Sequence, residues 1–431
     1  MKKIIDIADD TKHSFCIAKW LKVTMHFGMG ENHSCYHPPI HRWNLDQVKL
    51  DPSKLHNTDH KLQRRKEMLN GVRPDECNYC WQIEDLDPNV ISDRKRFNND
   101  SWATSERITT IKNSKWDTHF NPVYLELSFS NTCNFACSYC SPGQSSKWEQ
   151  EIRRLGSYPV DDPTVHKDKM HDMILEETNP YIEAFWQWLP DMYKDLEHLR
   201  ITGGEPLATK SFIKLLDYIA NNENKKLNLS INSNLCVPDK NLQAFFNKAK
   251  FLLESKSINS ITVYTSMDTW GKQAEYIRDG LDIERWELTV RQVHQLFSIP
   301  IRIMVTFGVM SIFSFNLFID KVLELRKDGI DIQFNIARLT NPKQFDLRIL
   351  PDEADIYFQS VNNKINNSNL MKRVEMETWE MTYKYWQSRN STMNLGEKIY
   401  FQDQFFKFIN EYDKRRNLNF NSTFPELSSW I

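Results

Sequence analysis

Apolar and polar residues alternate in short runs through the middle of the chain. The first run, at 124–130, reads Tyr-Leu-Glu-Leu-Ser-Phe-Ser, and an alternation of period two is typical of a β-strand. The same kind of run predicts five further strands, at 198–202, 227–232, 260–266, 301–309 and 331–337.

Helical patterns fill the gaps between these runs. Apolar residues recur at three- and four-residue spacing in 212–219, 242–249 and 317–323, as they do on the buried face of a helix. From the second strand on, the strands begin about 30 to 40 residues apart, which is the period of βαβ units with parallel strands. Six such units form either an open doubly wound sheet or a partial barrel, and both place functional groups at the carboxyl ends of the strands.

The two ends of the chain lack this alternation. We expect three parts: a small cysteine-rich domain at 1–115, an α/β core at 116–345, and a mostly helical segment at 346–431. The C-terminal segment is rich in aromatic residues, most of which should be ordinary core. No internal repeat or low-complexity tract is present.

Composition narrows the class of protein. Charged residues make up 26% and hydrophobic residues 40% of the 431, a balance typical of globular proteins. The net charge of −2 gives no reason to expect a nucleic-acid-binding surface. No run approaches the roughly 18 apolar residues of a membrane span, and the start does not read as a signal peptide. We therefore expect a soluble, cytoplasmic protein.

Three cysteines follow the first strand directly. Cys133, Cys137 and Cys140 lie within eight residues, so their thiolates can converge on one metal centre from a single loop. Thiolates suit iron–sulfur clusters and zinc. A structural zinc site normally has four protein ligands, so a local set of three favours a cluster that leaves one iron open.

The spacing C-x3-C-x2-C, with Tyr139 before the last cysteine, resembles the cluster loop of the radical S-adenosylmethionine (SAM) superfamily. The resemblance implies a partial (β/α)6 barrel in which Cys133, Cys137 and Cys140 hold a [4Fe–4S] cluster. SAM would chelate the fourth iron, and reductive cleavage of SAM would give methionine and a 5′-deoxyadenosyl radical that abstracts hydrogen from the substrate.

The end of the second strand supports the resemblance. Gly203-Gly204-Glu205-Pro206 is similar to the superfamily's GGEP motif, which binds the SAM amino group, and Glu205 would accept from that group. Glycine is scarce here, with 12 residues where average usage would give roughly 30, so an adjacent pair is informative. Glycines at such a turn also let backbone groups approach a ligand closely.

Two later positions are candidates for SAM contacts. Ser266 ends the fourth strand and Arg278 lies in the following helical region. By resemblance, the serine would touch the SAM ribose and the arginine its carboxylate. Otherwise Ser266 caps a helix and Arg278 lies on a solvated face. Asn232 and Asn234, after the third strand, are further candidates for nucleoside contacts.

Four more cysteines lie in the first 115 residues. Cys16, Cys35 and the pair Cys77-x2-Cys80 supply the four thiolates of a closed [4Fe–4S] or zinc site. They resemble the Twitch and SPASM auxiliary-cluster modules, although those modules usually follow the radical core. Zinc remains an alternative, because histidines near Cys35 could replace a cysteine; these are His33, His37 and His41. Cys236 is unpaired, and a buried structural thiol is its default interpretation.

The sequence thus predicts a radical SAM enzyme with an auxiliary cluster. Relatives with such modules commonly act on peptides, so a peptide or protein substrate is the first hypothesis. A small molecule, such as a nucleotide or cofactor precursor, is the second, and a non-enzymatic zinc protein is the third. Radical chemistry of this kind needs an electron donor such as flavodoxin or ferredoxin. The sequence names neither the substrate nor a catalytic acid or base.

Overall fold

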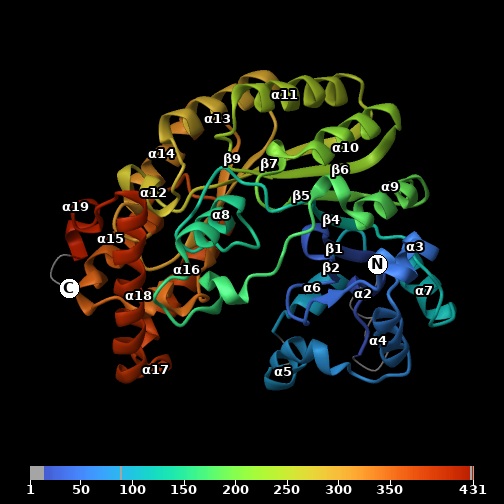
Figure 1. Cartoon of the computed structure of the whole chain (residues 1–431), viewed down its shortest axis with the longest axis horizontal. Helices are drawn as coiled ribbons and strands as arrows, with labels where there is room; N and C mark the ends of the chain where they lie inside the picture. The colour runs from blue at the N-terminus through green and yellow to red at the C-terminus, as the bar shows by residue number, and fades with distance from the viewer. Residues whose placement is uncertain (1–13, 88–89, 428–429, 431) are drawn as a thin grey trace.

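The computed structural model describes residues 14–87, 90–427 and 430. A single nine-stranded sheet runs through it in the order β3-β2-β1-β4-β5-β6-β7-β8-β9 (Figure 1). The strands are β1 Lys22–His26, β2 Glu31–His33, β3 His41–Arg42, β4 Tyr124–Ser128, β5 His198–Thr202, β6 Asn224–Ser233, β7 Ile258–Ser266, β8 Ile301–Phe307 and β9 Ile332–Arg338.

Strands β4 to β9 are parallel and lie side by side in chain order. A doubly wound sheet reverses its strand order at a switch point, so this uninterrupted order is that of a barrel. Within the described residues, β3 and β9 are the two free ends of the sheet, and the barrel is therefore partial. The α/β class and all six predicted strands are confirmed.

Helices cover the outer, apolar face of the barrel strands. Every second residue of β8 is buried, and Phe307 at its end packs edge-on against Phe315 of α14, with ring centroids 5.0 Å apart. Figure 1 shows α10, α11, α13 and α14 following one another around this side. The core helices are α8 Ser146–Leu155, α9 Pro180–Tyr193, α10 Lys210–Asn221, α11 Asp239–Glu254, α12 Lys272–Ile277, α13 Ile283–Phe297 and α14 Phe315–Lys327.

The N-terminal segment extends the sheet, which the sequence did not predict. Strand β1 pairs in parallel with β4, while β2 and β3 add antiparallel strands beyond it. The alternation in β1 is only five residues long, too short to stand out from the apolar run before it. A second apolar core lies beside this extension, around Trp20, Trp81 and Trp102. The helices of the N-terminal segment are α2 Ala18–Leu21, α3 Leu45–Leu50, α4 Asp59–Leu69, α5 Asn78–Leu86, α6 Asp93–Asn98 and α7 Ser105–Asn113.

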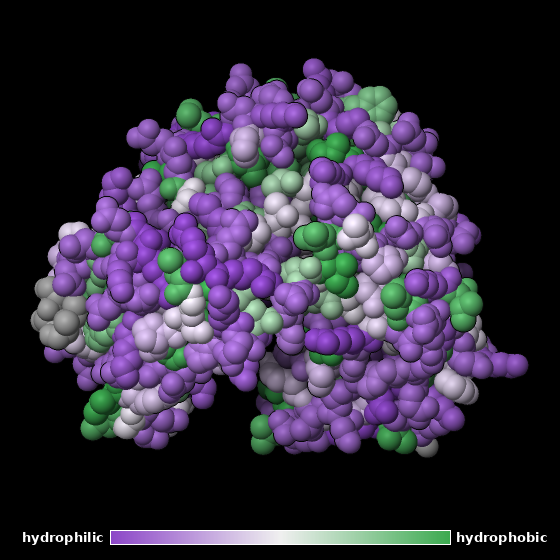
Figure 2. Space-filling view, in the orientation of Figure 1, coloured by the Kyte–Doolittle hydropathy of each residue, from purple (hydrophilic) through white to green (hydrophobic). Residues whose placement is uncertain are grey.

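The C-terminal segment is helical, as expected. Its helices are α15 Asp355–Asn367, α16 Arg373–Gln387, α17 Arg389–Thr392, α18 Leu395–Arg416 and α19 Phe420–Thr423. Most of its aromatic residues are core: Trp379, Trp386 and Phe405 are at most 1% exposed. In Figure 2 a notch separates these helices from the N-terminal ones, on a largely hydrophilic face. None of the described helices has the length and apolarity of a membrane span.

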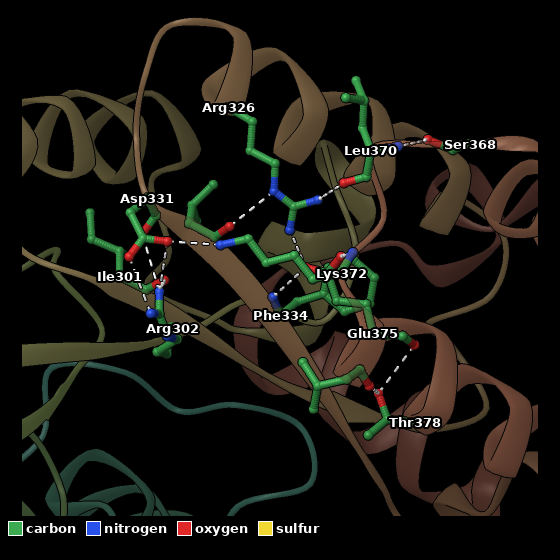
Figure 3. Close-up of polar contacts among 12 residues, drawn as sticks. Ile301, Arg302, Arg326, Asp331, Phe334, Ser368, Leu370, Lys372, Glu375 and Thr378 are labelled. Carbon is green, nitrogen blue, oxygen red and sulfur yellow. Dashed lines mark hydrogen bonds and ion pairs between the residues drawn. The ribbon is translucent and has the colours of Figure 1, made fainter.

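Helix α16 covers the edge of the sheet that β9 forms. Glu375, fully buried, accepts the backbone N–H of Phe334 in β9 at 3.0 Å and forms an ion pair with Arg326 of α14 (Figure 3). Thr378, one turn further on, accepts the N–H of Ile336 at 3.4 Å. An open edge strand presents unpaired backbone groups to other chains, so these contacts block further strand addition.

Replacing Glu375 with alanine should destabilise the fold. The change leaves the Arg326 guanidinium and the Phe334 N–H without their buried acceptor, and breaking a buried ion pair in this way typically costs about 3–5 kcal/mol. Denaturant unfolding of both variants measures the loss. Glu377→Ala is the control, because Glu377 lies on the same helix, is half exposed and pairs with the exposed Arg373. Equal stability of the two variants would contradict this role.

Candidate active site

The cysteine loop leaves the carboxyl end of β4 and is fixed by backbone hydrogen bonds. The N–H groups of Ala136 and Ser138 donate to the carbonyls of Asp279 and Ile277 at 2.8 and 2.7 Å. The indole of Trp148 in α8 donates to the carbonyl of Cys137 at 2.8 Å. The loop therefore has a rigid backing on the side away from the barrel mouth.

The three cysteines line an open pocket of about 740 Å³, counting the solvent at its mouth. The other walls come from the carboxyl ends of four successive parallel strands. Its residues are Cys133, Phe135, Cys137, Tyr139, Cys140, Gln144, Thr202, Gly203, Gly204, Asn232, Ser233, Asn234, Ser266, Arg278 and Thr306. The structure thus brings the predicted Gly203, Gly204, Ser266 and Arg278 together with all three cysteines, and a pocket of this size suits a ligand such as SAM.

Gly203 and Gly204 lie against the start of the cysteine loop. Gly203 has φ +110°, a conformation that favours glycine. A Cβ on Gly204 would lie 2.4 Å from the carbonyl oxygen of Thr132 and 2.6 Å from that of Asn131. The sequence attributed the glycines to close approach of a ligand; the structure shows that they also allow close approach of the loop that carries the cysteines.

Glu205 is 1% exposed and is held by the protein itself. Its carboxylate accepts the N–H of Asn234 at 2.7 Å, the hydroxyl of Ser233 at 2.8 Å and the N–H of Leu207 at 3.1 Å. Burial raises its pKa to about 7, although these hydrogen bonds act in the opposite direction. Glu205 thus fixes the turn after β6, which carries Ser233 and Asn234 into the pocket wall. Pro206 follows, buried, at the start of a short 3-10 helix, Pro206–Ala208.

Arg278 is buried and oriented by Asp268, a residue that the sequence analysis passed over. The guanidinium Nε and Nη2 each lie 2.9 Å from a carboxylate oxygen of Asp268, while Nη1 lies 3.7 Å from the sulfur of Cys137. Asp268 also accepts the Tyr139 hydroxyl at 2.8 Å and the Thr306 N–H at 2.7 Å. One fully buried carboxylate therefore fixes both Arg278 and the aromatic residue of the cysteine motif.

The two asparagines after the third predicted strand differ in role. Asn232 lines the pocket and accepts from Arg200 Nε at 3.1 Å. Asn234 donates to Asn134 of the cysteine loop at 2.8 Å and accepts the N–H of Cys236 at 2.8 Å. Cys236 is buried and its thiol lies 3.5 Å from the carbonyl of Asp282, as expected for a structural thiol.

The four N-terminal cysteines line a second, smaller cavity. Cys16, Cys35, Cys77 and Cys80 face it together with Lys19, His37 and Arg94. Burial raises the pKa of the Cys16 thiol, and the neighbouring thiols Cys35, Cys77 and Cys80 raise it further. Neutral thiols packed this closely become ligands only when a metal centre compensates the charge of their deprotonation.

The three histidines of the zinc alternative lie in different surroundings. His37 borders the cavity, but its Nε2 lies 2.5 Å from Asp93 and its ring stacks on Tyr79. His33 is buried with its Nε2 3.0 Å from that of His26. His41 lies beside Glu76, at 3.2 Å. Of these three histidines, His37 is the one that lines the cavity of the four cysteines in the described part of the chain.

No protein-family model matches the chain. Curated relatives are GTP 3′,8-cyclases: those of Haemophilus influenzae (strain PittEE), Pasteurella multocida (strain Pm70) and Peptoclostridium acidaminophilum are 32%, 24% and 23% identical over 100, 177 and 257 residues. These matches cover 23%, 41% and 58% of this chain and 23%, 41% and 62% of the relatives. The chain therefore spans less than two thirds of each. GTP 3′,8-cyclases are radical SAM enzymes, and the similarity supports an enzyme of that superfamily.

Substituting Gly204 with alanine should prevent an iron–sulfur cluster from assembling on Cys133, Cys137 and Cys140. The added methyl group meets two backbone carbonyls that cannot move without shifting Cys133. Iron per chain after anaerobic reconstitution should fall by about half if both sites take four irons. Gly143→Ala is the control in the same loop, since its Cβ would meet only the flexible end of Met29, at 3.4 Å. Full iron content in Gly204→Ala would contradict the packing argument.

Proposed function

We propose that the protein cleaves SAM reductively at a [4Fe–4S] cluster held by Cys133, Cys137 and Cys140, and that it acts on a small polar molecule of the nucleotide class. The observation that carries the proposal is the shared pocket. Three cysteines with one open ligand position, the Gly203-Gly204 turn, Ser266 and Arg278 all face it. A cluster bound there supplies the electron that cleaves SAM to methionine and a 5′-deoxyadenosyl radical.

The chain's own residues would position SAM. The Arg278 guanidinium, held by Asp268, is the cation available to the SAM carboxylate, while Ser266 and Asn232 offer polar groups to the ribose. Glu205 supports the amino-group end. Because its carboxylate already accepts three protein hydrogen bonds, its contribution includes holding the Ser233–Asn234 turn that forms the pocket wall.

A polar layer on the inner face of the barrel supports a small polar substrate. Arg200 lies two residues before the pocket-lining Thr202, so both point to the same face of β5. Its register partner in β4, Glu126, accepts from Thr202 at 3.4 Å, and Arg200 lies 4.7 Å from the centroid of Tyr264. Charged groups directly below the SAM pocket can orient the heteroatoms of a nucleotide.

The same layer touches the N-terminal cysteine site. Tyr36, next to Cys35, donates to both carboxylate oxygens of Glu126 at 2.7 Å. An auxiliary [4Fe–4S] cluster on Cys16, Cys35, Cys77 and Cys80 would thus lie next to the polar residues on the inner face of the barrel, on the side away from the SAM pocket. Such an arrangement supports the Twitch/SPASM-like module at 1–115, although here it precedes the core at 116–345.

We base the proposed substrate class on the comparisons with known proteins rather than on the resemblance of segment 1–115 to an auxiliary-cluster module. The relatives' name gives GTP as their substrate, which favours the small-molecule hypothesis over the peptide hypothesis. The electron would come from a protein donor such as flavodoxin or ferredoxin. Nothing in the charge or fold favours a nucleic-acid partner, and we propose a cytoplasmic enzyme whose C-terminal segment, 346–431, supports the core.

The triple variant Cys133→Ala/Cys137→Ala/Cys140→Ala should lose SAM cleavage. The variant lacks the thiolates of the first site but keeps the four cysteines of the N-terminal site. About four of roughly eight irons per chain should therefore remain. The readouts are 5′-deoxyadenosine formed with dithionite, and iron content. Cys236→Ala is the matched control and should keep both. Undiminished 5′-deoxyadenosine in the triple variant would exclude the assignment, and Cys77→Ala/Cys80→Ala with stoichiometric zinc loss would favour zinc in the N-terminal site.

Arg200→Gln should weaken the nucleotide without abolishing SAM cleavage. A charge-assisted hydrogen bond is worth roughly 1.5–3 kcal/mol, so KM for the best nucleotide found in a screen that begins with GTP should rise about ten- to a hundredfold. Deuterium transfer from labelled nucleotide into 5′-deoxyadenosine identifies the substrate. Arg291→Gln, on the outer helix α13, should leave KM unchanged. If only peptides promote deuterium transfer, the peptide hypothesis replaces this one.

A further inference from the structure

A group of potential metal ligands lies outside both cysteine sites. Among the described residues it is the single group of three or more His, Cys, Asp or Glu side chains whose ligand atoms all lie within 4.8 Å. Its members are His41 of β3, His60 of α4 and Glu76, in the turn before Cys77. We propose that they bind one divalent transition-metal ion of the zinc class.

The three ligand atoms converge on one point. Nε2 of His60 lies 2.6 Å from Glu76 Oε2, and Nε2 of His41 lies 3.2 Å from the same oxygen. The two imidazole rings are in contact and tilted by 33°, with centroids 3.9 Å apart. Ligand atoms at 2.0–2.2 Å from zinc are separated by roughly 3.3 Å in a tetrahedral site, so small rotations bring all three to that spacing.

His41 presents a buried ring nitrogen to this point. Nε2 is shielded from solvent and lies 3.2 Å from Glu76 Oε2. A metal ion between His41, His60 and Glu76 would be coordinated by this nitrogen and would lie between the two imidazole rings.

The surroundings suit a monodentate carboxylate ligand and an open fourth position. Lys19 forms an ion pair with Glu76 Oε1, which leaves Oε2 for the metal, and a partner of this kind orients a ligand. Glu76 is 8% and His41 19% exposed in its side chain, whereas His60 is 43% exposed. The metal thus enters from the His60 side, where water completes the coordination. Two imidazoles with one carboxylate form a ligand set known for zinc.

A metal ion bound to His41, His60 and Glu76 would link the three secondary-structure elements that carry these residues. These elements are strand β3, the start of α4 and the 3-10 helix Asp75–Cys77. Consecutive residues, Glu76 and Cys77, then serve two different sites. The ion fixes the turn that presents Cys77 to the auxiliary cavity.

Cobalt(II) is the probe, because its spectrum reports its ligands. The reconstituted, iron-loaded protein is stripped of loosely bound metal and titrated with cobalt, and zinc is then used to displace it. We expect one cobalt per chain with visible bands but without the intense near-ultraviolet absorption of cobalt–thiolate bonds. His60→Ala and Glu76→Gln should weaken cobalt binding by roughly a hundredfold or more, with iron content unchanged in His60→Ala.

His119→Ala is the matched control. His119 is 37% exposed and approaches Asp51 of the N-terminal segment at 3.4 Å, so its loss should leave cobalt affinity as in the unaltered protein. Cobalt affinity that is equal in His60→Ala and the unaltered protein would overturn the site. So would a bound cobalt with thiolate absorption, or no stoichiometric binding to the iron-loaded protein. Each of these results leaves the assignment of the two cysteine sets intact.

Discussion

The backbone contact between the cysteine loop and the segment 277–279 is the constraint on which the candidate site depends. Two hydrogen bonds join these segments, and each segment contributes to the pocket wall: cysteines from one, Arg278 from the other. Asp268 then ties Arg278 to Tyr139 of the loop. Asp268 and Arg278 are buried, so separating them would leave an unpaired charged group, which is costly in a protein interior. The protein's own contacts therefore hold these pocket groups in place.

Residues far along the chain, in helix α18, also hold the cysteine loop in place. The hydroxyl of Tyr412 in α18 reaches the carbonyl oxygens of Ala136 and Tyr276, at 3.3 and 3.2 Å. Arg416, one turn later, pairs with Glu151 of α8 and Asp279. The C-terminal helix thus packs behind the cysteine loop, on the side opposite to the pocket. The segment that the sequence predicted to be mostly helical is thus in contact with the cysteine loop and with the segment 276–279.

Local signals predicted the six parallel strands, and the resemblance to the superfamily favoured the barrel over a doubly wound sheet; contacts between distant segments could not be predicted. Period-two alternation and the spacing of the strand–helix units are properties of short windows, so β4 to β9 and the motifs Cys133 to Cys140 and Gly203 to Pro206 could be recognised. Strand β1 is five residues long and its partner lies about 100 residues away, so pairing is visible only in three dimensions. Asp268 was missed for the same reason: a lone aspartate signals nothing until its buried partners are known. The group His41, His60 and Glu76 spans 35 residues without a motif, and only folding brings it together.

The added strand β1 changes how the two cysteine sites relate to each other. If the N-terminal segment were a separate domain on a linker, its cysteines could lie anywhere over the barrel. Instead β1 shares a sheet with β4, and the loop after β2 returns Tyr36 to Glu126 on the inner face. Glu126 reaches Thr202 in the wall of the first pocket. A continuous set of polar contacts therefore connects Tyr36, the residue beside Cys35, with Thr202 in the wall of the first pocket. Because β1 and β4 are paired in one sheet, the sheet hydrogen bonds fix the length of this connection.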